Sequence, residues 1–246
     1  MTVAAPPGGR RLSPAEVEAQ IRDLRLVAIL RLDAGGLSSS QAVERAIRLC
    51  ETLDTSGVHA AEITLDQRYA LESIEAVAGR LGERVLLGAG TVLDADAVDA
   101  AADAGARFCV SPHLDADVVA ACRRRDLLPL PGVLTPSEVV AARALGVGTV
   151  KLFPAEPLGP AYLATLRGPF ASIGFMPTGG VHLENAPRWL SAGAVALGVG
   201  SWLVPADGAL DGLAERARDL VRTVRSHPAA SGAGAPAGRG PITDRR

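Results

Sequence analysis

Short runs of apolar and β-branched residues alternate along the chain with longer stretches whose apolar residues recur at helical spacing. This pattern gives eight units in which an expected strand is followed by an expected helix. The strands are expected at residues 26–31, 58–65, 84–89, 107–111, 127–130, 149–153, 173–177 and 194–199. The helices are expected at residues 39–53, 69–81, 95–104, 115–125, 136–145, 160–166, 183–191 and 209–225.

A further helix is expected before the first strand, where Ser13, Pro14 and Glu16 have the spacing of a helix N-terminus. Several expected strands are apolar almost throughout (LVAIL, VLLGA, AVALGV), which is typical of parallel strands covered on both faces. The repeated unit, its number and the chain length predict an α/β protein. We expect one (β/α)8 TIM barrel with an extra N-terminal helix, and an open doubly wound sheet is the alternative.

The two ends of the chain lack this hydrophobic period. Residues 1–11 and 228–246 are rich in Pro, Gly, Ala and Arg. Such segments bury too little apolar surface to offset the entropy of ordering, so we predict disordered tails. The barrel domain is then expected at residues 12–227.

Composition and charge exclude several classes of function. The 246 residues are 48% apolar and 21% charged, with a formal net charge of −2, which leaves no basic excess for binding nucleic acid. The start of the chain has no apolar signal region, and the three cysteines are widely spaced. We therefore expect a soluble cytoplasmic protein that binds neither nucleic acid nor a membrane.

Lys151 is the only lysine among 25 basic residues. A guanidinium cannot act as an amine nucleophile, whereas a buried lysine amine loses its proton more easily and attacks a carbonyl carbon. Compositional drift could also leave a single lysine. However, Lys151 lies between Val150 and Leu152 in the sixth expected strand, where alternate residues face the barrel interior. Its position favours an imine-forming lysine at a catalytic end of the barrel.

Glu62 lies in the otherwise apolar second strand (AAEITL). Unpaired buried carboxylates are rare, so Glu62 either forms a salt bridge or acts as a proton shuttle, with Thr64 on the same strand face as a candidate hydrogen-bond partner. Thr91 ends the third strand, where its hydroxyl can meet a substrate carboxylate. Glycine pairs follow the seventh and eighth strands (PTGGV and GVGS), where barrels commonly bind phosphate.

Seven motifs between residues 26 and 205 occur in the order of one known family: AAEITL, GAGTVLD, FCVSP, LPGVLTPSEV, VKLFPAE, MPTGGV and GSWLVP. The sequence resembles the class I 2-keto-3-deoxy-6-phosphogluconate (KDPG) aldolase family, whose members often also cleave 4-hydroxy-2-oxoglutarate (KHG). The resemblance implies a homotrimer of (β/α)8 barrels. It also implies Lys151 as the imine-forming residue, Glu62 as the proton shuttle, Phe153 beside the imine, Thr91 and Thr178 at the pyruvate moiety, and Gly179, Gly180, Gly200 and Ser201 at the phosphate.

Two positions depart from the family pattern. Well-known members carry an arginine four residues after the catalytic glutamate, where this chain has Asp66, whose charge has the wrong sign for a substrate carboxylate. Arg31, at the end of the first strand, resembles an arginine of the related 6-phosphogalactonate aldolases and is the expected replacement. His113 stands where the family has glycine, and it is either a solvated loop residue or a substrate contact.

The resemblance implies a lyase of the Entner–Doudoroff pathway. It would cleave 2-keto-3-deoxy-6-phosphogluconate to pyruvate and glyceraldehyde 3-phosphate, and possible second substrates include 4-hydroxy-2-oxoglutarate. The alternatives are a 2-keto-3-deoxy-6-phosphogalactonate aldolase, a metal-dependent aldolase or isomerase, and a non-catalytic barrel that binds a phosphorylated metabolite. The four histidines share no ligand spacing, so no metal and no cofactor are expected.

Overall fold

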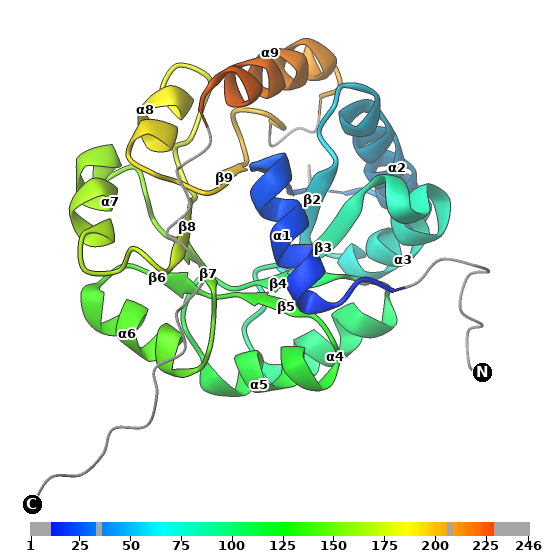
Figure 1. Ribbon diagram of the computed structural model, residues 1–246. Coiled ribbons are helices and arrows are strands. Elements are labelled where there is room, and N and C mark those ends of the chain that lie inside the picture. The colour runs from blue at the N-terminus through cyan, green and yellow to red at the C-terminus, as the bar shows by residue number, and fades with distance from the viewer. Residues whose placement is uncertain (1–10, 33–35, 206–208, 229–246) are drawn as a thin grey trace, which may run out of the picture.

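Figure 1 shows the computed structural model, which describes residues 11–32, 36–205 and 209–228. Of the two predicted tails, residues 1–10 and 229–246 lie outside the described ranges. Within those ranges, no helix is both long enough and apolar enough to cross a lipid bilayer.

Parallel strands and helices alternate along the described chain. The strands are β1 (Leu26–Leu30), β2 (Ala60–Thr64), β3 (Leu86–Gly90), β4 (Phe108–Val110), β5 (Leu128–Leu130), β6 (Gly132–Val133), β7 (Thr149–Leu152), β8 (Gly174–Pro177) and β9 (Leu197–Val199). The helices are α1 (Pro14–Leu24), α2 (Ser39–Thr55), α3 (Ala70–Leu81), α4 (Ala95–Asp103), α5 (Ala116–Arg124), α6 (Pro136–Ala144), α7 (Gly159–Arg167), α8 (Ala186–Ser191) and α9 (Leu213–Ser226), with a 3-10 turn η1 (Gly82–Arg84).

The strands form two parallel sheets with the orders β5-β4-β3-β2-β1-β9 and β6-β7-β8. The fifth expected strand continues beyond its predicted end, because β5 and β6 follow one another with only Pro131 between them. A proline has no N–H to donate, and the ladder changes partner there: β5 pairs with β4, and β6 pairs with β7. A parallel bridge between Thr178 and Gly198 joins the end of β8 to β9. The predicted parallel α/β architecture is therefore present.

Three elements begin later in the sequence than predicted, because a local turn precedes each of them. Arg84 lies in the turn η1, so β3 begins two residues later than expected. The last helix begins at Leu213 rather than residue 209, because Gly212 precedes it with a left-handed backbone (φ 69°). At α8, His182 N–H donates to Asn185 Oδ1 (2.9 Å), which keeps the preceding residues in a turn.

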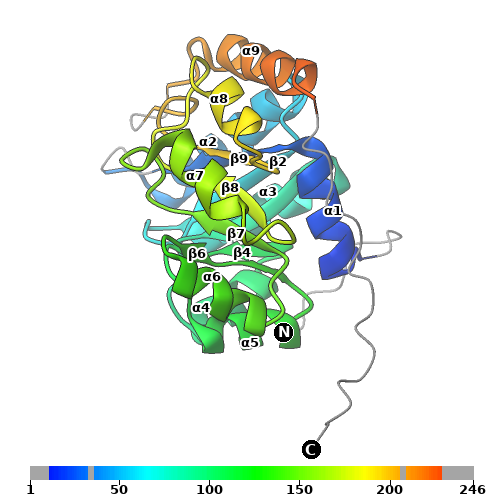
Figure 2. The ribbon, with the colours of Figure 1, turned by 60° about the vertical axis from the view of Figure 1, so that its left-hand side comes forward.

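The apolar core has two layers. The outer layer fills the space between the strands and the helices that surround them (Figure 1). The inner layer is a separate cluster on the strand face that is turned away from those helices, and it includes Val27, Ala60, Leu86, Phe108, Val110, Leu128, Leu130, Met176 and Ala196. Val17 and Ile21 of α1 belong to this inner cluster, so α1 packs across the end of the interior at which the strands begin (Figure 2).

Candidate active site

Strands β2 and β7 place Glu62 and Lys151 on the strand face that carries the inner core layer. Their neighbours Ala61, Val150 and Leu152 belong to the outer core layer, so strand alternation turns the two charged side chains inward. Glu62 is 1% exposed and Lys151 is 6% exposed. Two ionisable groups from distant parts of the sequence are thus buried in the same interior.

The Lys151 amine lies over an aromatic ring. Its Nζ is 4.7 Å from the centroid of the Phe153 ring, two residues further along the chain. Burial lowers the pKa of Lys151 from its usual value, and the positive charge of Arg31 acts in the same direction, while the negative charge of Glu62 opposes both. Lys151 therefore loses its proton at a lower pH than a lysine in water does, which favours the neutral, nucleophilic amine.

The Glu62 carboxyl group lies against the backbone of β3. A Cβ at Gly90 would come within 2.7 Å of Glu62 Oε1, so glycine is needed there for the carboxyl group to fit. Glu62 Oε2 is buried and has no hydrogen-bond partner in the described part of the chain. Burial raises the pKa of Glu62, and the charges of Lys151 and Arg31 partly offset that rise. A carboxyl group whose pKa is raised keeps its proton to higher pH than a carboxyl group in water, which suits a group that gives and takes protons.

The proposed pairing of Glu62 with Thr64 is wrong. The Thr64 hydroxyl donates to the Leu30 carbonyl oxygen (3.4 Å) and accepts a short hydrogen bond from Gln67 Nε2. The strand face was predicted correctly, since Thr64 is buried like Glu62, but the end of β1 and the loop after β2 supply closer partners. The unpaired carboxyl oxygen of Glu62 therefore remains available.

Arg31 follows β1 and lies within electrostatic range of the two buried groups. Its charge lowers the pKa of both Lys151 and Glu62. Arg31 Nε is 3.9 Å from Asp66 Oδ2, and the side chains are 59% and 46% exposed, so this is a loose surface pair. The structure thus brings Arg31, the expected replacement for the family's arginine, close to Asp66, which stands in that arginine's place.

Two threonines lie at the ends of β3 and β8. Thr91 directly follows β3 with a left-handed backbone (φ 56°). Thr178 is buried, donates to the Met176 carbonyl oxygen (3.3 Å), and packs so closely on Gly198 that a Cβ there would lie 2.3 Å from its hydroxyl oxygen. Both residues thus lie at the carboxyl-terminal ends of strands, as predicted.

The two glycine turns lie on neighbouring strands because β8 and β9 are bridged. Gly179 and Gly180 have φ values of 93° and 73°, a region that residues with a side chain rarely adopt. The N–H of Gly180 donates to no acceptor in the described chain, and neither does the N–H of Ser201. Gly200 accepts from Leu203 N–H at 2.9 Å, which folds the second turn. Unpaired N–H groups in glycine turns can bind an anion.

His113 lies in the loop after β4 with its side chain exposed. Its carbonyl oxygen accepts from Gly132 N–H (3.2 Å), which ties the loop to β6. Gln67 was not among the predicted site residues, although its side-chain amide reaches the ends of both β1 and β2. In the residues that the structure describes, no group of three or more His, Cys, Asp and Glu side chains is placed to hold a metal ion.

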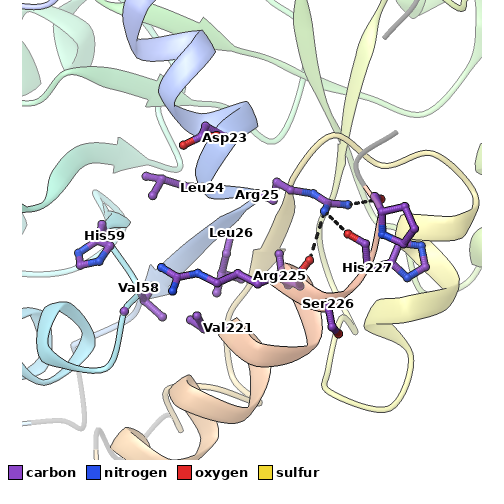
Figure 3. Close-up of a pocket in the computed structure, with 13 residues that line it drawn as sticks. Asp23, Leu24, Arg25, Leu26, Val58, His59, Val221, Arg225, Ser226 and His227 are labelled. Atoms are coloured by element: carbon purple, nitrogen blue, oxygen red, sulfur yellow. Dashed lines mark hydrogen bonds between the residues drawn. The ribbon is translucent and has the colours of Figure 1, made fainter. Parts of the chain in front are cut away.

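A cavity of about 540 Å³ lies at the opposite end of the strands and contains none of the predicted site residues. It is lined by the end of α1, the start of β1, the residues just before β2 and the end of α9 (Figure 3). Arg25 on its wall donates to the carbonyl oxygens of Val224 (3.2 Å), His227 (2.7 Å) and Pro228 (3.1 Å). This guanidinium therefore caps the carboxyl-terminal end of α9.

Comparison with known proteins gives consistent matches. Residues 17–215 match the family described as "Aldolase: KDPG and KHG aldolase". A 2-dehydro-3-deoxy-phosphogluconate aldolase of Treponema pallidum is 39% identical over 167 residues, which are 68% of this chain and 79% of the relative.

Two solved structures are similar across most of the chain. A KDPG aldolase of Zymomonas mobilis, solved with 3-phosphoglycerate, has a TM-score of 0.74 and 30% identity and covers 85% of this chain and 96% of its own. A KDPG aldolase of Legionella pneumophila, solved with pyruvate as a covalent carbinolamine, has a TM-score of 0.71 and 25% identity and covers 88% of this chain and 98% of its own.

Proposed function

This chain belongs to the KDPG and KHG aldolase family and is a lyase, and from this premise we propose that it cleaves 2-keto-3-deoxy-6-phosphogluconate to pyruvate and glyceraldehyde 3-phosphate. Cleavage of 4-hydroxy-2-oxoglutarate to pyruvate and glyoxylate is a second activity of the same site. The first reaction belongs to the Entner–Doudoroff pathway. The observation that carries the proposal is the burial of Lys151 and Glu62 in one interior, with opposite pKa shifts.

Lys151 and Glu62 divide the chemistry between them. The neutral Nζ of Lys151 adds to the C2 carbonyl carbon, and protonated Glu62 gives the proton with which the hydroxyl leaves as water. The product is a protonated imine. The Glu62 carboxylate then removes the proton of the C4 hydroxyl, the C3–C4 bond breaks, and its electrons pass into an enamine as the aldehyde departs. Glu62 returns the proton to C3, and water hydrolyses the imine to pyruvate. The hydrolysis frees the amine and restores the proton to Glu62.

The remaining predicted residues divide into two subsites. We assign Arg31, Thr91, Thr178 and Phe153 to the pyruvate moiety, and Gly179, Gly180, Gly200 and Ser201 to the phosphate. Support for the first comes from the electrostatic reach of Arg31 and from the ring of Phe153 at the amine. Support for the second comes from the N–H groups of Gly180 and Ser201, which have no acceptor among the described residues and lie in two adjacent glycine turns. The Zymomonas mobilis relative was solved with a small phosphorylated acid.

We also propose that residues 12–227 form a closed (β/α)8 barrel, with α1 as an extra helix across its amino-terminal end. The continuity of β5 and β6 through Pro131 and the bridge between β8 and β9 support closure. The resemblance further implies a homotrimer in the cytoplasm, and both statements are proposals carried over from the family.

The central test exploits the absence of any other lysine from the sequence. Lys151→Arg keeps the positive charge but removes the nucleophile, so kcat should fall by at least about 10⁴-fold. In wild-type protein, borohydride with pyruvate should attach a reduced adduct to the peptide that contains Lys151, and mass spectrometry reads this directly. The variant should carry no adduct at that position. Substantial cleavage by a folded Lys151→Arg protein would refute the imine mechanism.

Three alternatives to this proposal were expected from the sequence. Family membership decides against a non-catalytic binding barrel and against a metal-dependent aldolase. The galactonate substrate is still a candidate because Arg31 lies at the site while the family's usual arginine is replaced by Asp66. The two substrates are epimers at C4, so comparing kcat/KM for both phosphorylated acids decides between them.

A further inference from the structure

We propose that Gln67 is a positioning residue that fixes Arg31 for binding the substrate carboxylate, and that it thereby sets the affinity of the site for 2-oxo acids. The proposal deepens the proposed function and rests on it. Gln67 lies three residues after Thr64 in the loop that follows β2, and its side chain is half-buried. Its described hydrogen bonds go to Leu30, Leu32 and Thr64, so we place its effect in the chain segment that it holds.

The Gln67 amide holds the backbone on both sides of Arg31. Its Oε1 accepts a short hydrogen bond from the Leu32 N–H, and its Nε2 donates to the Leu30 carbonyl oxygen (3.4 Å). Nε2 also donates to the Thr64 carbonyl oxygen (3.4 Å) and, in a short hydrogen bond, to the Thr64 hydroxyl. One side chain thus links the residues before and after Arg31 to the end of the strand that carries Glu62.

A second side chain completes this attachment. Arg45 of α2 donates from Nη1 to the Leu32 carbonyl oxygen (3.1 Å). Both backbone polar groups of Leu32 are therefore bound by side chains, and the Leu32 side chain is buried. Arg31 is consequently the exposed residue of a segment whose backbone is held on both sides. Fixing the backbone limits the positions that the guanidinium can sample, which reduces the entropy lost on binding.

Among the residues that the structure describes, the Arg31 side chain has no comparably firm contact. Its ionic partner is Asp66, at 3.9 Å between two half-exposed side chains, which is a weak interaction. An incoming carboxylate can displace such a partner. The charge of Arg31 nevertheless acts on Lys151 and Glu62, so movement of this guanidinium should be detectable at the reacting groups.

The test is Gln67→Met, which keeps the side-chain volume and removes the amide. We measure the half-saturating pyruvate concentration for borohydride trapping of Lys151, and KM and kcat for cleavage. The half-saturating pyruvate concentration and KM should each rise about 10-fold, while kcat changes by less than about three-fold. The acid limb of the trapping profile should also move to higher pH, because a displaced Arg31 no longer lowers the pKa of Lys151. Gln67→Asn, which is too short to span both strands, should act in the same direction.

Gln41→Ala is the matched control. It also removes a side-chain amide that accepts a backbone N–H, from Ser38 at 2.9 Å, but at the start of α2. It should leave both the half-saturating concentration and the pH profile unchanged. In a double-mutant cycle, Gln67→Met should add little to the defect of Arg31→Gln, because the two changes remove the same interaction.

The outcomes separate the two proposals. If wild-type protein is not trapped by pyruvate, the proposed function fails. If it is trapped and the Gln67 variants bind pyruvate like wild type, the positioning role alone is wrong. Additive effects of Gln67→Met and Arg31→Gln would likewise show that Gln67 does not act through Arg31.

Discussion

The interior of this protein holds polar side chains at both ends of the strands, and the two groups are bonded very differently. At the end covered by α1, the Thr149 hydroxyl donates to Glu18 Oε1 (2.6 Å) and accepts from Arg22 Nη2 (2.8 Å). Arg22 Nη2 also donates to Glu18 Oε1 (2.8 Å) and to the Gly148 carbonyl oxygen (3.0 Å). At the other end, Glu62 Oε2 has no partner in the described chain.

Strand β7 takes part in both arrangements, because Thr149 and Lys151 are two residues apart on it. The bonded cluster needs space: a Cβ at Gly148 would lie 2.6 Å from Glu18 Oε1, and one at Gly174 would lie 2.7 Å from the Thr149 hydroxyl. Satisfied groups stabilise a fold, whereas unsatisfied buried groups destabilise it and have altered pKa values. On the proposed assignment of Lys151 and Glu62, the α1 end serves stability and the Lys151 end serves chemistry at a cost in stability.

After the loss expected for Lys151→Arg, the largest expected effect at this end is the loss of activity in Glu62→Gln. The amide fills the space of the carboxyl group but cannot carry a proton between the substrate and the imine. We expect kcat to fall by about 10²- to 10⁴-fold, as measured by steady-state cleavage assays. The variant should fold normally. A kcat near that of wild type would mean that another group moves the protons and that the two ends of the interior differ less than proposed.

A second expected effect is confined to the α1 end. Thr149→Val keeps the shape of the side chain but removes the hydroxyl that joins Glu18 to Arg22, so the free energy of unfolding should fall by about 1–3 kcal/mol. Urea denaturation measures this change, and kcat should stay within about three-fold of wild type. Thr55→Val on the exposed side of α2, whose hydroxyl donates to Glu51 O at 2.9 Å, is the control and should cost little. A large loss of kcat without a loss of stability would contradict this division of roles.

Sequence alone predicted the strand positions of Lys151 and Glu62, because strand alternation and an unusual residue in an apolar run are local signals. It also predicted the glycine turns, since a left-handed backbone strongly restricts residue type. It missed the cluster around Thr149, whose members Glu18 and Arg22 are 131 and 127 residues away. It also missed the role of Gln67, because a glutamine after a strand has no distinctive pattern and its partners are backbone atoms of another strand.

The smallest expected effect concerns the stability of the Lys151 end. Burial raises the pKa of Glu62 above its ordinary value of 4.5, so between the two values the folded chain binds a proton that the unfolded chain has released. This contribution to stability is therefore lost as the pH rises from 4.5 through the folded pKa. Glu62→Met removes the cost of ionising a buried carboxyl group, so at pH values above the folded pKa of Glu62 the variant should be more stable than wild type by about 1–2 kcal/mol. Urea denaturation across a pH series should show the difference growing as the pH rises above 4.5. A difference that shrinks as the pH rises would mean that Glu62 is stabilised as a carboxylate, in which case both ends of the interior would hold satisfied charges.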